Sequence, residues 1–218
     1  SAKMRARKIV QHDNHLAIGF VPSAEVNLLP GVLPLFRRKQ PNTRVELVSL
    51  ITTEQEDKIR SGELDIGLMR HPIYSPEIDY LELLHEPLVV VLPVDHPLAK
   101  AEKVSASQLD GVDFVSTDPA YSGALAPIVQ AWFEQQKSQP RIVQVATNIL
   151  VTMNLVGMGL GVTLIPGYMN HFNTGRVVFR PIAGNAPTIA LLMAWKKGTI
   201  KPALADFIAT AREHAAAG

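Results

Sequence analysis

Polar side chains stand at four points of the chain where an apolar, strand-like run gives way to a helix-like pattern. These points carry Ser23 beside Ala24; Thr52 and Thr53; Ser116, Tyr121, Ser122 and Gly123; and Thr147 and Asn148. The start of a helix presents free backbone N–H groups, which together with hydroxyl donors favour an anion. The residue types therefore predict a site that binds a small carboxylate without a catalytic group.

The same side chains have a simpler interpretation as helix N-caps, each worth about 1 kcal/mol to its helix. Thr53 and Glu56 have the spacing of a capping box. For Ser23 the two interpretations are compatible. We expect its hydroxyl to cap a helix when the site is empty and to donate a hydrogen bond to an acid when one is bound.

Arg70 is a further candidate for this site, because it ends the strand-like run "LDIGLM" at the same predicted edge. The alternatives are a surface arginine and an ion pair with Glu86 in "LLHEPL".

The elements that must position these residues alternate along the first part of the chain. We predict strands at 15–20, 44–50 and 64–69, with helices at 25–39 and 53–61. This alternation predicts a parallel sheet, and ligands collect at the carboxyl ends of such strands. "IDYLELL" and "PLVVVLP" follow with too few residues between them for a crossover helix, so we predict two antiparallel strands there.

A second α/β unit begins at Val112 and repeats this order. Its strands and helices are "VDFVS", "GALAPIVQAWFEQQ", "RIVQVA", "ILVTMNLVG" and "GVTLIP". A strand at 188–195 and an amphipathic helix at 201–217, with Leu204, Phe207 and Ile208 on one stripe, are expected to return to the first unit. Two crossings predict a hinged pair of lobes with a cleft between them.

Composition argues against several classes of protein. The 218 residues are 47% hydrophobic, enough for a substantial core, and no apolar run reaches the roughly 20 residues of a membrane helix. A net charge of +1 supplies no broad basic face for nucleic acid. There is no cysteine, and the seven histidines lack a repeated ligand spacing, so we predict no bound metal.

No cofactor is predicted either. "GMGLG" at 157–161 follows a helix and precedes a strand, the reverse of a dinucleotide-binding turn, and we expect Gly157 or Gly159 to end that helix. Neither G-x-x-x-x-G-K-[ST] nor G-x-S-x-G occurs. With no cysteine and no export signal, we expect a cytoplasmic location.

The order of several segments resembles the effector-binding domain of LysR-type transcriptional regulators. The resemblance covers about residues 15–212 and rests on "FRRKQPNTRVEL", "SGELDIGL", "DHPLA" and "NLVGMGLGVTLIP". It implies two Rossmann-like subdomains, similar to type II periplasmic binding proteins, with a small effector in the cleft between them. Residues 13–92 and 188–218 would form regulatory subdomain I, and residues 93–187 subdomain II.

The resemblance also implies roles for individual residues. Ser23 and Thr52 match the hydroxyls that hold the effector carboxylate in aromatic-responsive relatives, and 121–125 matches the opposite wall. A homodimer, tetrameric in the full-length protein, would pair the helix at about 28–39 with the helix at about 124–136. Within the family, "AEVNLLP" and "RHPIYSPEIDYLEL" are most similar to enterobacterial activators of 3-phenylpropionate and cinnamate catabolism.

The DNA-binding part of such a regulator is expected to lie outside this sequence. Residues 1–12 resemble the end of the linker helix that follows a winged helix-turn-helix. We therefore expect this chain to bind an effector and to self-associate, while the N-terminal domain contacts DNA. The alternatives are a solute-binding receptor of a transporter and an enzyme acting on aromatic acids.

Overall fold

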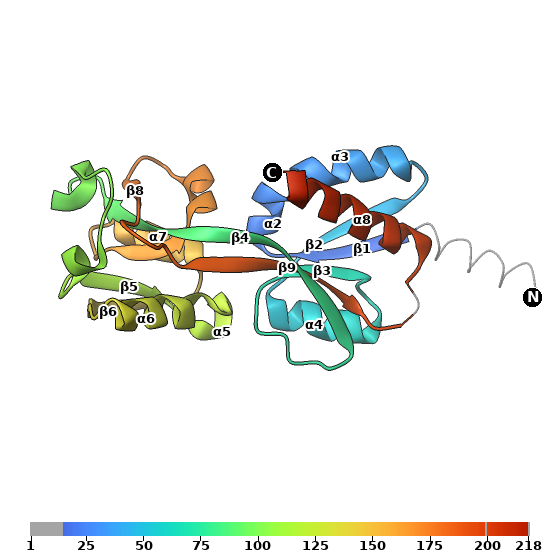
Figure 1. Ribbon diagram of the computed structural model, residues 1–218, viewed down its shortest axis with the longest axis horizontal. Coiled ribbons are helices and arrows are strands. Elements are labelled where there is room, and N and C mark those ends of the chain that lie inside the picture. The colour runs from blue at the N-terminus through green and yellow to red at the C-terminus, as the bar shows by residue number, and fades with distance from the viewer. Residues whose placement is uncertain (1–14, 199, 218) are drawn as a thin grey trace, which may run out of the picture. The chain divides into compact units, whose positions relative to one another are not determined.

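The computed structural model describes residues 15–198 and 200–217 (Figure 1). The chain divides into two compact units. Of the described residues, those up to Leu84 and those from Ala190 onward form the first unit, and His85–Ile189 form the second. The linker helix assigned to residues 1–12 lies outside the described residues.

The first unit is built on three parallel strands, as predicted, and their order in the sheet is β2-β1-β3. The strands are β1 (His15–Phe20), β2 (Arg44–Ser49) and β3 (Ile66–Met69). Strand β9 (Thr188–Lys196) lies antiparallel beside β3, so the chain returns to this unit as expected.

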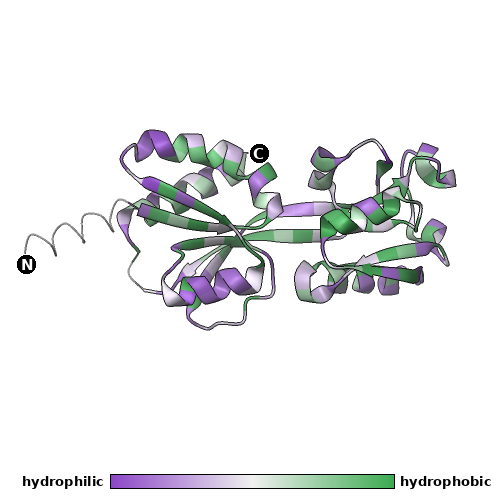
Figure 2. Ribbon diagram, turned by 180° about the vertical axis from the view of Figure 1, so that it is seen from behind, coloured by the Kyte–Doolittle hydropathy of each residue, from purple (hydrophilic) through white to green (hydrophobic). Residues whose placement is uncertain are grey.

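Helices cover both faces of this sheet (Figure 1). Helices α2 (Pro22–Asn27), α3 (Leu29–Lys39) and α8 (Pro202–Ala217) lie on one face and α4 (Thr52–Ser61) on the other. Because side chains alternate along a strand, Leu16 and Ile18 enter the core under α3 and α8, whereas Ala17 enters the core under α4. Helix α4 is largely hydrophilic (Figure 2) and buries only Gln55, Glu56 and Ile59.

The single helix predicted at 25–39 is wrong, because the structure has two helices that meet at Leu28. Leu28 has φ −120° and ψ −57°, outside regular helix geometry. Pro30 explains the break. Its ring nitrogen carries no proton for the hydrogen bond to residue 26 that a continuous helix needs, and it disfavours helical geometry at Leu29.

The two antiparallel strands predicted from "IDYLELL" and "PLVVVLP" are also wrong. The structure has one strand of 16 residues, β4 (Ile78–Pro93), which runs from the first unit into the second. Only His85 and Glu86 separate the two apolar runs, and neither favours the positive φ that a two-residue hairpin turn requires. The chain therefore continues in an extended conformation.

The second unit contains the elements predicted for it, in the predicted order. Its strands and helices are β5 (Asp113–Thr117), α5 (Pro119–Ser122), α6 (Leu125–Gln135), β6 (Arg141–Ala146), α7 (Ile149–Gly157) and β7 (Thr163–Pro166). Strands β5 and β6 are parallel, and β7 pairs antiparallel with the second half of β4. Three 3-10 helices, Pro97–Lys100, Ala106–Leu109 and Gly167–Phe172, and strand β8 (Val177–Pro181) complete the unit.

Candidate functional site

The first two polar corners lie at the same edge of the sheet of the first unit. Phe20, the last residue of β1, is the register partner of Ser49, the last residue of β2. The Leu50 amide donates to the Phe20 carbonyl at 3.1 Å, so the two strand ends are adjacent. Ser23 and Thr52 each follow by three residues, at the starts of α2 and α4.

Ser23 is completely buried, and its Oγ has no hydrogen-bond partner in the described chain. The prediction that Ser23 caps a helix is wrong, because Val21 is the N-cap and Ser23 lies inside the first turn of α2. Ala24 is equally buried and packs in the core. A buried hydroxyl without a partner costs about 1–3 kcal/mol of stability. A ligand that supplies an acceptor to Ser23 would remove this cost.

The hydroxyl of Thr52 accepts a hydrogen bond from the backbone N–H of Arg70 at 3.1 Å. This bond uses an oxygen lone pair and leaves the hydroxyl proton for a further bond. The Arg70 side chain is 7% exposed, so the interpretation as a surface arginine is wrong, and Glu86 is buried to the same extent.

The capping box predicted from Thr53 and Glu56 is wrong. The N-cap of α4 is Ile51, and Thr53 is an exposed residue of the first turn. The Glu56 carboxylate instead accepts hydrogen bonds from the backbone N–H groups of Tyr74, at 3.2 and 3.3 Å, and Ser75, at 2.5 Å. The Glu56 carboxylate, which the local pattern assigned to the end of the helix, therefore binds the backbone of a distant segment instead.

Gln55, which is fully buried at this edge, was not among the site residues predicted from the sequence. Its Nε2 donates to the carbonyl of Leu50, which follows β2, at 2.8 Å and to the carbonyl of Leu68, the last but one residue of β3, at 3.3 Å. Glycines on β1 and β3 make room for this amide: a Cβ at Gly19 or Gly67 would lie 3.0 or 2.8 Å from its Oε1. Gly19 and Gly67 are register partners on β1 and β3, and a glycine in each of the two strand-like runs is the part of this arrangement that the sequence contains.

We expect Gln55→Ala to lower the free energy of unfolding by about 1–3 kcal/mol, because the Leu50 carbonyl loses its donor, whereas the Leu68 carbonyl keeps the bond from the Val21 N–H. Equilibrium unfolding in urea measures this change. The matched control is Gln130→Ala on α6, an exposed amide bonded to Glu134, which should change stability by less than about 0.5 kcal/mol. Equal effects of the two substitutions would contradict this role for Gln55.

The third corner lies at the carboxyl end of β5 in the second unit. Ser116 is a half-buried residue of β5, whereas Tyr121 and Ser122 belong to α5, and Gly123 ends that helix with φ +56°. Tyr121 is 54% exposed. The Oγ of Ser122 is buried without a partner in the described chain, as in Ser23.

The fourth corner adjoins the third, because Thr117 of β5 is the register partner of Ala146 of β6. Thr147 is exposed. Asn148 is the N-cap of α7, and its Oδ1 accepts from the Val151 N–H at 2.9 Å. The N-cap interpretation is therefore confirmed for Asn148.

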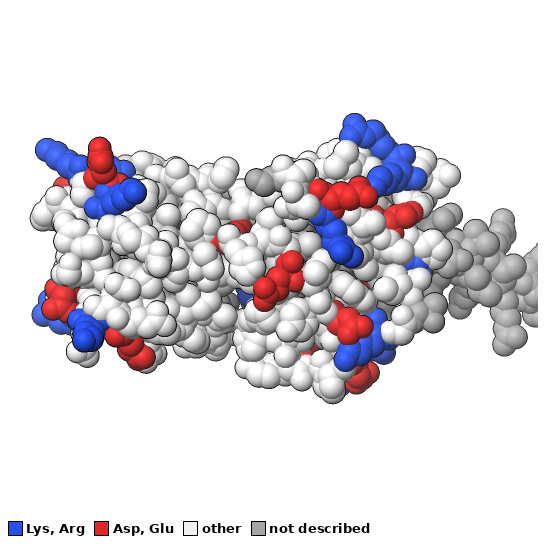
Figure 3. Space-filling view, in the orientation of Figure 1, with Lys and Arg blue, Asp and Glu red and all other residues white. Residues whose placement is uncertain are grey.

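The residues that the structure describes also bear on membrane crossing, metal binding and surface charge. No helix in residues 15–198 or 200–217 is long and apolar enough to cross a membrane. Within the same residues, no group of three or more histidine, aspartate or glutamate side chains is placed to hold a metal ion. Acidic and basic side chains are interspersed on the face that Figure 3 draws.

The chain belongs to the LysR substrate-binding domain family, whose sequence pattern matches residues 11–216. It is the effector-binding domain of a LysR-type transcriptional regulator, and the alternative of a transporter receptor is set aside.

The chain is 78% identical to the Hca operon transcriptional activator HcaR of Escherichia coli (strain K12) over 216 residues, which are 99% of this chain and 73% of that protein. It is 29% identical to the HTH-type transcriptional regulator CatR of Pseudomonas putida over 187 residues, 86% of this chain and 64% of that protein. The relatives are transcriptional regulators longer than this chain.

Two solved structures show the same fold. The BenM effector binding domain with its effector benzoate matches with a TM-score of 0.81 at 24% identity, covering 93% of this chain and 92% of that one. Full-length CbnR complexed with its target DNA matches with a TM-score of 0.82 at 20% identity, covering 97% of this chain and 74% of that one.

Proposed function

We propose that this domain senses a small aromatic carboxylate of the 3-phenylpropionate or cinnamate class and thereby controls transcription. The observation that carries the proposal is the Ser23 hydroxyl, buried at the carboxyl end of a parallel strand without a partner in the described residues. The 78% identity to the activator of the Hca operon supports the regulatory role.

In the first unit, the proposed carboxylate site consists of Ser23, Ala24, Thr52, Thr53 and Arg70. Ser23 and Thr52 supply hydroxyl donors, and the first turn of α4 supplies backbone N–H groups. Each hydrogen bond to a charged ligand contributes about 1.5–3 kcal/mol, so two of them account for useful affinity without a metal or cofactor.

In the second unit, the proposal assigns ligand contact to Ser116, Tyr121, Ser122, Gly123, Thr147 and Asn148. The unpartnered hydroxyl of Ser122 supports this assignment. The side chain of Asn148 already accepts a bond from its own helix, so its amide N–H groups are the part that a ligand would use.

The regulatory consequence follows from linkage. An effector shifts a conformational equilibrium only by the difference between its affinities for the two states. We propose that residues 13–92 and 188–218 act as one regulatory subdomain and residues 93–187 as the other, in a cytoplasmic homodimer that becomes a tetramer when full length. DNA would be bound by an N-terminal domain, and no catalytic step is assigned to this chain.

The first test compares 3-phenylpropionate with the uncharged 3-phenylpropan-1-ol in a thermal-shift titration of the parent protein. At 100 times its dissociation constant, the acid should stabilise the domain by about 2.7 kcal/mol. The alcohol should have little effect, because it lacks the carboxylate that the hydroxyls recognise. An equal response to both compounds, or to neither, would refute the carboxylate site.

The second test addresses the proposed dimer. The parent chain should show a concentration-dependent dimer mass by light scattering, and Ala131→Glu on the exposed face of α6 should weaken it by placing a charge in the interface. Ala209→Glu, at an exposed alanine on α8, is the control and should leave the mass unchanged. A monomer at all concentrations would overturn this part.

A further inference from the structure

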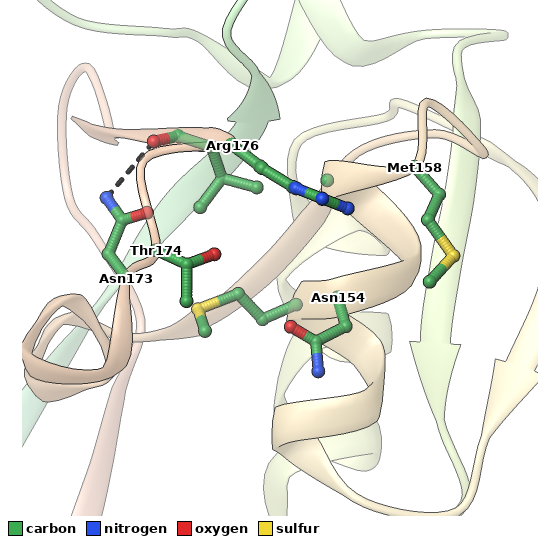
Figure 4. A pocket seen from close by; sticks show the side chains of 8 residues that line it. Asn154, Met158, Asn173, Thr174 and Arg176 are labelled. Carbon is green, nitrogen blue, oxygen red and sulfur yellow. Dashed lines mark hydrogen bonds between the residues drawn. The ribbon is translucent and has the colours of Figure 1, made fainter.

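A cavity of about 470 Å³ opens at the C-terminal end of α7 in the second unit (Figure 4). Its volume lies in the range of small-molecule sites, which is about 300–1,000 Å³. The last turns of α7 form one wall, and residues 173–177, which lead into β8, form the other. All of these residues belong to the second unit.

The wall at 173–177 is held in place by the amide of Asn173. Its Nδ2 donates to the Val177 carbonyl at 3.1 Å, drawn in Figure 4, and its Oδ1 accepts from the Gly175 N–H at 2.9 Å. These bonds fix the turn from which Thr174 and Arg176 project.

The guanidinium of Arg176 extends across the end of α7 (Figure 4). Within the described chain it makes no ion pair and no hydrogen bond, and none of the residues that line the cavity is acidic. A guanidinium has five N–H donors, and here all of them are open to a ligand. An unneutralised cation on a cavity wall favours an anionic guest.

The end of α7 does not require these donors. The N–H groups of Met158, Gly159 and Leu160 bond to the carbonyls of Asn154, Val156 and Leu155 at 3.1, 2.9 and 3.2 Å. This is a Schellman closure with Gly159 at φ +82°, as predicted for a glycine in this stretch. Since the helix satisfies these carbonyls itself, Arg176 is not needed as its cap.

Gly157 lets the arginine lie close to the helix. A Cβ on Gly157 would stand 3.1 Å from the Cβ and 3.9 Å from the Cδ of Arg176. Because Gly157 has no side chain, the aliphatic part of the Arg176 side chain can lie against the helix.

The remaining lining side chains divide by chemistry. Asn154 and Thr174 add an amide and a hydroxyl, neither bonded within the described residues. Met153, Met158 and Val177 supply an apolar surface, and methionine side chains adapt to flat or irregular guests. From this combination we propose that the cavity is a second ligand site, for a small organic monoanion with an apolar body.

The test uses benzoate as the probe and benzyl alcohol as its uncharged counterpart. The 218-residue chain is labelled with ¹³C at the methionine methyl groups, and the resonances of Met153 and Met158 are assigned with Met153→Leu and Met158→Leu. Benzoate should shift both resonances, and benzyl alcohol should shift them much less. Absence of a shift with millimolar benzoate would overturn the proposal.

Arg176→Gln should raise the dissociation constant of benzoate, read from these two methyl groups, at least about tenfold, because the charge-assisted bonds are lost. Lys103→Gln removes one charge from an exposed position of the same unit outside the cavity lining and should leave the constant unchanged. Equal constants for the parent and Arg176→Gln would overturn the proposal.

The cavity site is independent of the effector site proposed in the first unit. Ser23→Ala should therefore weaken the thermal response to 3-phenylpropionate while the Met153 and Met158 shifts with benzoate persist. Loss of these shifts in Ser23→Ala would overturn the cavity site. If the parent protein shows the methyl shifts with benzoate but no thermal response to 3-phenylpropionate, the site in the first unit is refuted and the cavity site is not.

Discussion

Ser23→Ala should make the ligand-free domain more stable by about 1 kcal/mol and weaken 3-phenylpropionate binding by about 10- to 150-fold. The gain follows because the substitution removes a fully buried hydroxyl that has no partner in the described chain. The loss follows because the same hydroxyl is the proposed donor to the carboxylate, a bond worth about 1.5–3 kcal/mol. Urea unfolding and ligand titration measure the two effects.

Two further variants separate this explanation from a general effect of the substitution. Ser138→Ala removes a serine that is also buried, at 7% exposed, and whose Oγ donates to the Ala106 carbonyl at 2.7 Å, so it should lower stability by about 1 kcal/mol and leave ligand binding unchanged. Thr52→Val should lower the ligand-free stability, because the Arg70 N–H loses its acceptor. It should also weaken 3-phenylpropionate binding, because the proposed hydroxyl donor is removed. A fall in ligand-free stability for Ser23→Ala would show that its hydroxyl is satisfied.

Phe207→Ala should lower the free energy of unfolding of the first unit by about 3–5 kcal/mol. Phe207 of α8 is fully buried and meets Phe36 of α3 edge to face, with 5.4 Å between ring centroids. Removal of the ring leaves a cavity where α8 covers the sheet, since the surrounding backbone cannot collapse into it. Urea unfolding followed by circular dichroism measures the change.

The control is Phe172→Ala in the second unit, where the ring is 38% exposed and the expected loss is about 1 kcal/mol or less. A double-mutant cycle of Phe36→Leu with Phe207→Leu should give a coupling energy of about 0.5–1.5 kcal/mol from the ring contact. Similar losses for Phe207→Ala and Phe172→Ala would mean that α8 is not part of the core.

Local patterns predicted much of the fold because they record which side chains must be buried. The alternation of apolar strands and helices foretold the parallel sheet of the first unit and the order of elements in the second. The stripe of Leu204, Phe207 and Ile208 foretold the face that α8 presents, with the first two buried and Ile208 packed against the same core. These features need no knowledge of distant contacts.

The errors arose where distant groups compete with local ones. Glu56 has the spacing of a capping box, yet its carboxylate binds the backbone of residues 74 and 75. Strand β8 was missed because its side chains, of which only Val177 is buried, show no alternation of buried and exposed positions. Gln55 was missed because a polar residue in a hydrophilic helix gives no sign of being buried.

For the candidate site, the sequence predicted where the polar corners lie but not whether each hydroxyl has a hydrogen-bond partner. Ser23 and Thr52 have similar positions relative to their strands, and only the folded structure distinguishes a hydroxyl without a partner from one that already accepts a bond. The state of a donor depends on which atoms surround it, and that depends on the whole packed unit.

The division of the chain into two units determines which of them can complete its fold first during synthesis. The second unit is one uninterrupted segment and can fold as soon as it leaves the ribosome, whereas the first stays incomplete until β9 and α8 have been synthesised. Until then the apolar face that α8 will cover is open to chaperones and to other nascent chains. A truncation before residue 190 should therefore yield a protein whose second half is ordered and whose first half is recognised by quality control.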